Sequence, residues 1–264
     1  MAFCYLTNLQ KIKISKSVQT MGSNPFRYSS SSFTIEIEEG NEYLNFQDNI
    51  LYETKTGKLI HYMSSSSRIE YTIPNYIKMI GRYSFDSEPY IKKLIISDSV
   101  EQFDSIPFEN MISLVSIYIG KNVNQMGANP LFYCKKLTTI TIDEENTNFI
   151  FKNNFLMDIN ETTIYSYLYV TKTEITIPNT IKKLEHRSFC ANKNLQKVII
   201  EGNIDYLNGY VFEGCSNLQT IDYKGTTSPT CGLGNFENIH TSFKIQVPSN
   251  YNGDTFCDKT VKKI

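Results

Sequence analysis

Histidines, cysteines and acidic runs are the residues of this 264-residue chain that could do chemistry. His186 and Cys190 stand four apart on a predicted turn, with Glu185 beside them. A Cys–His nucleophile needs an orienting group, and a metal site needs more ligands. The neighbourhood offers no second histidine and no Cys-x-x-Cys pair. We therefore expect Cys190 to pack and His186 to be solvated, and a hydrolase stays a remote alternative.

The other reactive residues also lack partners in the sequence. His61 lies on a predicted strand, and His240 lies in an irregular stretch. The segment Cys231–Gly234 lacks the strand and helix of a phosphate-binding loop, and Asp143–Glu145 lacks the spacing of a calcium loop. Asn160 begins a glycosylation sequon at a predicted hairpin tip, which matters only if the chain is secreted. The sequence predicts no catalytic residue, no metal site and no cofactor.

The elements that carry these residues repeat along the chain. After a shift of 105 residues, Met21–Phe26 aligns with Met126–Leu131. Phe33–Ile37 aligns with Thr138–Ile142 and returns as Phe243–Val247. A fixed internal period indicates one supersecondary unit stacked on copies of itself.

A shorter period lies inside the long one, with the frame F-x-x-x-x-x-L-x-x-I-x-I. Alternating β-branched residues predict a short strand with one buried face. Ten residue pairs fill this strand slot: Ile12/Ile14, Ile35/Ile37, Tyr71/Ile73, Leu94/Ile96, Ile117/Ile119, Ile140/Ile142, Ile175/Ile177, Val198/Ile200, Ile221/Tyr223 and Ile245/Val247. Most of them follow one another at 23 residues, which lies in the range of leucine-rich repeats.

Two longer steps, of 36 and 35 residues, predict inserted hairpins. The first runs through Asn49–Tyr52, a turn at Thr56–Lys58 and Leu59–Tyr62. The second runs from Asn154–Met157 to Ile164–Tyr167 without the glycine. A hairpin alone is weakly stable, so we expect each one to lean on its neighbours.

A further pattern, I-P-x-x-I-x-x-I-x-x-x-S-F-x-x-x-x-x-L-x-x-(I/L/V)-x-I, runs from Ile73 through Phe85 and again from Ile177 through Phe189. It resembles the BspA-like leucine-rich repeat over nearly the whole chain. Ser29–Ser32 and Thr226–Glu237 depart from it. The resemblance implies a surface protein involved in adhesion and recognition, with no catalytic residues to carry over.

The expected fold is a leucine-rich-repeat solenoid, β-rich within the α/β class. It has about ten short parallel strands, short helical turns or irregular segments opposite, and two inserted hairpins. Residues 1–264 are expected to form one domain, with long copies at about 3–107, 108–211 and, in part, 212–264. Phe3 is already mid-repeat, and solenoids need polar caps. We expect a fragment uncapped at both ends, which is a monomer or associates weakly end to end.

Composition and charge narrow the range of partners and compartments. With 26 basic and 27 acidic residues and no basic stripe, nucleic acid is not an expected partner. No apolar run is long enough to predict a membrane span, and no signal peptide is visible. Cys134 and Cys215 share an interior slot, whereas Cys231 and Cys257 could pair. The resemblance implies a cell-surface or secreted protein, and a cytoplasmic one is the alternative.

The outward face of the predicted sheet is the candidate binding surface. With the paired apolar residues pointing inward, the residue between them points outward. The surface so predicted consists of Lys93, Ile95, Tyr118, Thr141, Thr176, Lys197 and Ile199. Ile95 and Tyr118 resemble binding anchors with a charged rim, although such residues also simply favour strands. The predicted function is non-enzymatic recognition or adhesion toward a protein or glycan, including host or extracellular-matrix ligands. An intracellular scaffold or inhibitor is the alternative.

Overall fold

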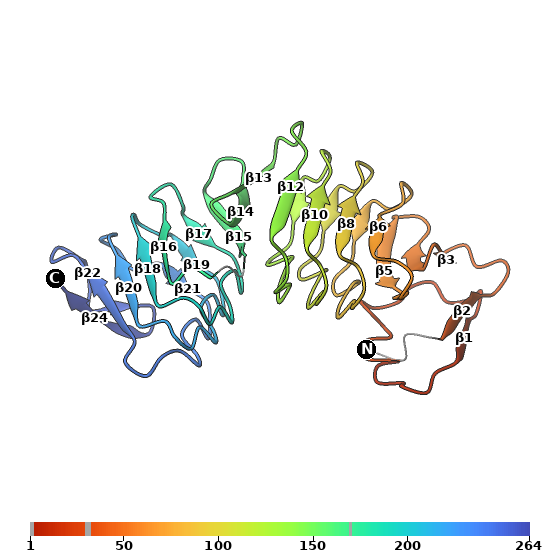
Figure 1. The fold of residues 1–264 in the computed structure, drawn as a ribbon, viewed down its shortest axis with the longest axis horizontal. Coiled ribbons are helices and arrows are strands. Elements are labelled where there is room, and N and C mark those ends of the chain that lie inside the picture. The colour runs from red at the N-terminus through yellow and green to blue at the C-terminus, as the bar shows by residue number, and fades with distance from the viewer. Residues whose placement is uncertain (1–2, 30–32, 169–170) are drawn as a thin grey trace. The chain divides into compact units, whose positions relative to one another are not determined.

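The computed structural model describes residues 3–29, 33–168 and 171–264, so part of the departure at Ser29–Ser32 lies outside the described residues. The chain divides into two compact units, Met1–Thr147 and Asn148–Ile264. Each unit is a stack of coils in which short strands lie side by side (Figure 1). The described residues contain no helix that could span a membrane.

The first unit carries two parallel sheets built from the predicted strand slots. One sheet pairs β1 (Lys11–Ile14) with β2 (Thr34–Ile37). The other, called here the first main sheet, has four strands: β6 (Glu70–Thr72), β8 (Lys93–Ile96), β10 (Ser116–Ile119) and β12 (Thr139–Ile142). Its strands pair in register, so equivalent residues of successive coils lie side by side.

A six-stranded sheet along another side of the same coils contains the first hairpin. Its members are β3 (Leu44–Gln47), β4 (Ile50–Glu53), β5 (Lys58–Tyr62), β7 (Met79–Ile80), β9 (Gln102–Phe103) and β11 (Gln125–Met126). The first three strands are antiparallel, and β5, β7, β9 and β11 continue as a parallel ladder. The hairpin therefore gains its stability by extending this ladder.

The second unit repeats the plan. Its hairpin sheet contains β13 (Phe149–Lys152), β14 (Phe155–Asp158), β15 (Thr163–Tyr167), β17 (Lys183–Leu184), β19 (Tyr206–Leu207) and β21 (Thr230–Cys231). The second main sheet contains β16 (Glu174–Ile177), β18 (Lys197–Ile200), β20 (Thr220–Tyr223), β22 (Lys244–Val247), β24 (Lys259–Lys263) and β23 (Thr255–Phe256). The antiparallel pair β23–β24 ends this sheet.

All ten predicted slots are strands, and both predicted hairpins are present. The ten strands do not form one continuous sheet, however, because neither β2 with β6 nor β12 with β16 pairs among the described residues. In each copy the hairpin-bearing coil lies between those two strands in the sequence. It contributes its strands to the hairpin sheet, so the main sheet is interrupted there.

The corners opposite the main sheets are turns, with no helix among the described residues. The residues two before and two after a core phenylalanine have positive φ, as Tyr83 (59°) and Ser87 (59°) do around Phe85. This geometry points the N–H groups of Tyr83, Phe85 and Ser87 at carbonyls of the next coil, at 3.1, 3.0 and 2.8 Å. An α-helix would direct those N–H groups back into its own coil, so this corner ladder replaces it.

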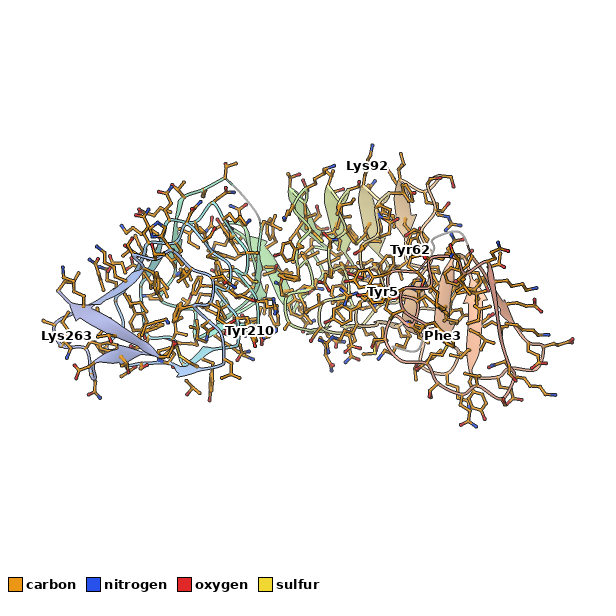
Figure 2. All side chains as sticks on the ribbon, turned by 90° about the horizontal axis from the view of Figure 1, so that it is seen from below. Phe3, Tyr5, Tyr62, Lys92, Tyr210 and Lys263 are labelled. Atoms are coloured by element: carbon orange, nitrogen blue, oxygen red, sulfur yellow. A yellow bond between two sulfur atoms is a disulfide. The ribbon has the colours of Figure 1, made fainter. Side chains whose placement is uncertain are left out.

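Side chains fill the interior of the coils (Figure 2), and core phenylalanines of successive coils pack against one another behind these corners. The ring centroids of Phe85 and Phe108 lie 5.7 Å apart, and those of Phe189 and Phe212 lie 5.3 Å apart. All four side chains are buried. Burial of each ring stabilises the fold by roughly 1.5–3 kcal/mol. This stabilisation is gained only when a neighbouring coil packs on the ring and excludes water from it.

Candidate functional site

The first main sheet places Ile95, Tyr118 and Thr141 in one row across β8, β10 and β12. Tyr118 is the in-register partner of Ile95 on one side and of Thr141 on the other. Ile95 and Tyr118 are half-buried, while Thr141 is exposed. The neighbouring outward column contains Lys93, whose ammonium lies 3.4 Å from a carboxylate oxygen of Glu70. An apolar pair therefore lies beside an ion pair on this face.

Tyr118 is tied to the loop that follows β12. Its hydroxyl donates a short hydrogen bond to the carboxylate of Asp143. This hydrogen bond raises the pKa of Tyr118 to about 12 and lowers the pKa of Asp143. At neutral pH the phenol thus stays protonated and its ring is held in one orientation.

The remaining predicted residues lie in the second unit. Thr176 on β16 is the in-register partner of Ile199 on β18, and Lys197 lies 3.4 Å from Glu174. The first main sheet has the same two pairs, the ion pair Glu70–Lys93 and the in-register pair Thr72–Ile95. The position equivalent to Tyr118 is Asp222, which pairs with Lys224 at 2.7 Å. Thr141 and Thr176 belong to separate sheets, so the structure shows two faces, each with part of the predicted residue set.

The geometry around Cys190 does not favour nucleophilic chemistry. Its thiol lies 3.5 Å from a Glu213 carboxylate oxygen and 3.6 Å from an Arg187 nitrogen. Burial, together with Glu213, raises the pKa of Cys190 to about 12. The ring of His186 packs edge-on against Tyr210, with centroids 5.5 Å apart. The thiol stays protonated at neutral pH, which is the opposite of what a cysteine nucleophile needs.

His61 and His240 both make local structural contacts. His61 Nδ1 lies 3.0 Å from the side-chain oxygen of Asn24, and burial lowers the pKa of His61 to about 4. His61 is half-buried, and its ring is neutral at physiological pH. His240 Nδ1 lies 2.8 Å from the Ser242 hydroxyl within a turn. No group of three potential metal ligands occurs among the described residues.

Two further candidates have simple surroundings. In the acidic run after β12, Asp143 binds Tyr118, and Glu145 pairs with Lys121 at 2.7 Å. Asn160 is exposed in the turn between β14 and β15, where a sequon is accessible. Whether this asparagine carries a glycan stays a prediction.

Cys231 and Cys257, whose pairing the sequence left open, form a disulfide with a Cα–Cα distance of 5.5 Å. It connects β21 to the turn between β23 and β24. The remaining cysteines, Cys4, Cys134, Cys190 and Cys215, are free thiols. Burial raises the pKa of Cys134 and of Cys215 to about 12, as expected for interior packing groups.

Sequence reasoning missed a cluster around Arg27. Its guanidinium lies over the rings of Tyr28 and Tyr83, at 4.7 and 4.6 Å from their centroids. It also binds Asp86 at 2.6 Å and Glu109 at 3.0 Å, the latter two coils away. Arg-Tyr dipeptides at the corner slot, here and at Arg82-Tyr83, are the sequence signal that could have revealed it.

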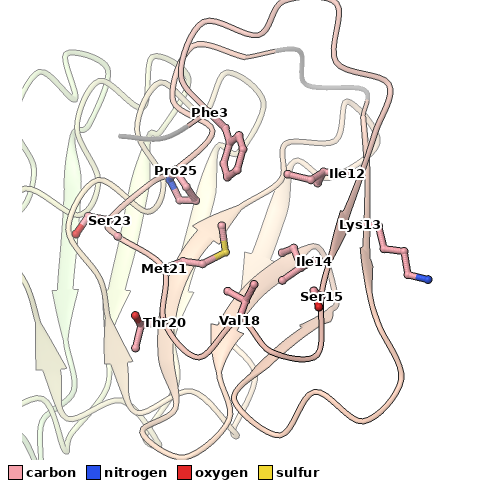
Figure 3. Close-up of a pocket in the computed structure, with 11 residues that line it drawn as sticks. Phe3, Ile12, Lys13, Ile14, Ser15, Val18, Thr20, Met21, Ser23 and Pro25 are labelled. Carbon is pink, nitrogen blue, oxygen red and sulfur yellow. The ribbon is translucent and has the colours of Figure 1, made fainter.

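Sequence reasoning also missed an apolar cavity of about 470 Å³ beside β1. Figure 3 shows Ile14, Val18 and Met21 converging on this cavity while Lys13 points away. Phe3 and Pro25 complete one wall. The cavity exposes the side of the core next to β1, which has no second strand partner among the described residues.

Comparison with known proteins agrees with this architecture. A family model described as a BspA type leucine-rich repeat region, in six copies, matches residues 1–71, 60–170 and 152–259. No curated protein matches the sequence.

Solved structures of other proteins are similar to this chain to different degrees. The pneumococcal vaccine antigen PcpA is 19% identical with a TM-score of 0.61, and the match covers 93% of this chain and 64% of that one. A leucine-rich repeat protein from Eubacterium ventriosum is 18% identical with a TM-score of 0.41, covering 76% of this chain and 74% of that one. A leucine-rich repeat protein from T. pallidum, TpLRR, is 14% identical with a TM-score of 0.45, and the match covers 76% of this chain and 88% of that one. This chain thus spans less than two thirds of the pneumococcal structure. The family model covers nearly all of the sequence, and the chain belongs to the BspA-type leucine-rich repeat family.

Proposed function

We propose that this chain is a non-enzymatic recognition or adhesion module. It binds a protein or glycan partner through the outward faces of its main sheets. The observation that carries the proposal is the in-register pair of Ile95 and Tyr118, with the ring of Tyr118 held by Asp143. A fixed aromatic ring beside an aliphatic side chain and a charged rim is the composition found at binding hot spots. The protonated Cys190 thiol argues against a hydrolase.

We also propose that the protein acts at the cell surface or after secretion. Disulfides persist in oxidising compartments and are rare in the cytosol. The Cys231–Cys257 bond therefore supports a surface role over an intracellular scaffold. The free thiols do not contradict this, because Cys134 and Cys215 are buried and protonated.

Binding of the purified chain to matrix proteins, mucins and a glycan array tests the proposal. We expect Ile95→Asp/Tyr118→Asp to weaken a detected interaction at least about tenfold, the range for a lost hot spot. The matched control is Gln102→Asp/Gln125→Asp, which places the same charges on two in-register strands of the hairpin sheet in the same unit. Thermal unfolding of each variant shows that the stack is intact. Equal affinity of the wild-type protein and the Ile95/Tyr118 variant would place the binding site elsewhere.

A further inference from the structure

A polar cavity of about 290 Å³ lies between the second hairpin and the first strand of the second main sheet. Asn153 and Tyr167 line it from the hairpin, and Lys172, Glu174 and Thr176 line it from β16 and the segment just before it. Phe155 and Ile175 supply the apolar part of the lining. Thr176 also belongs to the outward face discussed above, so the cavity opens beside that surface.

The second copy lacks a clamp that the first copy has at the equivalent position. In the first copy the Tyr71 hydroxyl donates to the Asp48 carbonyl at 2.9 Å, and the Tyr76 hydroxyl donates to the Asp48 carboxylate at 2.9 Å. The equivalent residues are Ile175, Thr180 and Asn153. These cannot make the same bonds, because isoleucine has no hydroxyl and threonine is far shorter than tyrosine.

One buried group at this cavity has unused hydrogen-bonding capacity. Tyr167 is only 4% exposed, and its hydroxyl has no hydrogen-bond partner among the described residues. A buried hydroxyl without a partner is costly, so a ligand or water that supplies one is stabilised at this point.

The lining defines the chemistry of a ligand. Lys172 and Glu174 contribute one charge of each sign, so the lining has no net charge. An amide, two hydroxyls, an ammonium and a carboxylate offer many donors and acceptors in a small volume beside an aromatic ring. A pyranose has the matching surface, with a rim of hydroxyls and apolar C–H faces. The volume lies at the small end of ligand sites, which suits one sugar unit.

Resting on the proposed recognition function, we propose that this cavity binds one neutral hexose unit, such as the terminal residue of a glycan. Asn153, Lys172, Glu174 and Thr176 contact its hydroxyls, and the Tyr167 hydroxyl gains its missing partner. The inference names the glycan as the ligand class and separates its site from the Ile95–Tyr118 pair.

Saturation-transfer NMR with the methyl glycosides of glucose, galactose, mannose and N-acetylglucosamine tests this proposal on the full chain. We expect saturable binding of at least one glycoside. Asn153→Ala should weaken it roughly tenfold, the effect of about 1.4 kcal/mol. The swap Phe155→Ile/Ile175→Tyr, which gives the second copy the residues of the first, should abolish it.

Two controls distinguish this proposal from the surface proposal. Gln246→Ala, on the same sheet away from the cavity, and Ile95→Asp/Tyr118→Asp should both leave glycoside binding unchanged. No saturable binding of any glycoside to the folded chain overturns the proposal. Binding that survives both Asn153→Ala and the swap overturns it as well. Neither result depends on whether a macromolecular partner binds the sheet face.

Discussion

The two hairpin-bearing coils place an aromatic ring at the same point of the core from different strands. In the first coil, the ring centroid of Tyr71 on β6 lies 4.8 Å from that of Tyr62 and 6.2 Å from that of Phe85. In the second coil, the ring centroid of Phe155 on β14 lies 5.2 Å from that of Tyr167 and 6.1 Å from that of Phe189. Ile50 and Tyr71 of the first copy correspond in sequence to Phe155 and Ile175 of the second copy. The aromatic volume is kept while its source moves from one sheet to the other.

The exchange preserves packing but loses a polar connection. Tyr71 carries a hydroxyl that reaches Asp48 in the turn between β3 and β4, whereas Phe155 carries none. Core packing depends on volume and shape, so two strands can trade a ring at little cost. A hydrogen bond between hairpin and sheet depends on which strand bears the hydroxyl. The comparison teaches that two copies with the same core can differ in how firmly the hairpin is held.

Removal of the exchanged ring should have the largest effect. Phe155→Ala should lower the free energy of unfolding by about 3–5 kcal/mol, because it leaves a cavity in the core. The swap Phe155→Ile/Ile175→Tyr should stay within about 1.5 kcal/mol of the wild type, because the ring returns from β16. Urea denaturation measures both. A swap as unstable as Phe155→Ala would refute the equivalence of the two coils.

Loss of the disulfide should affect the second unit alone. Cys231→Ser/Cys257→Ser removes a cross-link over 26 residues, for which the chain-entropy estimate is about 3.5 kcal/mol. Hydrogen exchange should show faster opening of β21, β23 and β24. The first unit has no disulfide among its described residues and serves as the internal reference. Equal acceleration in both units would contradict this prediction.

Acid should weaken the first unit through His61. Burial lowers the pKa of His61 to about 4, so the folded state holds the neutral ring. The unfolded chain binds a proton below its ordinary pKa of about 6.5. Stability that is present above pH 6.5 is therefore lost as the pH falls toward 4, by on the order of 2–3 kcal/mol.

His61→Gln should remove this part of the pH dependence. The difference between wild type and variant is the quantity to measure, by urea denaturation between pH 7 and 4, because it cancels the titration of other groups. The second copy has Ser166 at this position and cannot contribute in the same way. If the free energy of unfolding depends on pH in His61→Gln as it does in the wild type, the histidine is not responsible for the loss of stability in acid.

The hydroxyl of Tyr71 should have the smallest effect. Tyr71→Phe retains the ring and removes the hydrogen bond to Asp48, which should cost about 1 kcal/mol. Hydrogen exchange in β3 and β4 should rise toward the rates of β13 and β14. A second variant, Tyr76→Phe, removes the other hydrogen bond to Asp48, from a half-buried ring. Unchanged exchange in both variants would show that the clamp does not hold the hairpin.

The sequence was sufficient to predict the strands and the adjacency of Ile95 and Tyr118. A period of two within a period of 23 determines both which residues face outward and which lie side by side. The interruption of the main sheet was not predicted, because it depends on the inserted strands joining a different sheet. Strands of two residues, such as β7 and β17, are too short to carry a periodicity.

The cavity of the second copy was not predicted for a different reason. To predict it, Ile50 and Tyr71 of the first copy must be aligned with Phe155 and Ile175 of the second. The two residues of each copy lie about 20 positions apart in the sequence. Each substitution alone is conservative for a core. The effect of losing the Tyr71 hydroxyl becomes apparent only when the two residues of each pair are seen to lie together in the fold. The sequence does not show that they do.

The corner ladder around Phe85 constrains how this protein can change its length. Between the interruptions of the main sheet, each coil is bonded to the next at the main sheet, at the hairpin sheet and at the corner, where Tyr83, Phe85 and Ser87 donate to the following coil. A single inserted residue is accommodated only where the donors still meet their acceptors on all three sides, as they do across the 24-residue step from β20 to β22. Whole coils, by contrast, can be duplicated with every donor meeting an acceptor. The corner ladder therefore favours changes of length by whole coils, and it limits smaller insertions to places that leave the bonded sides in register.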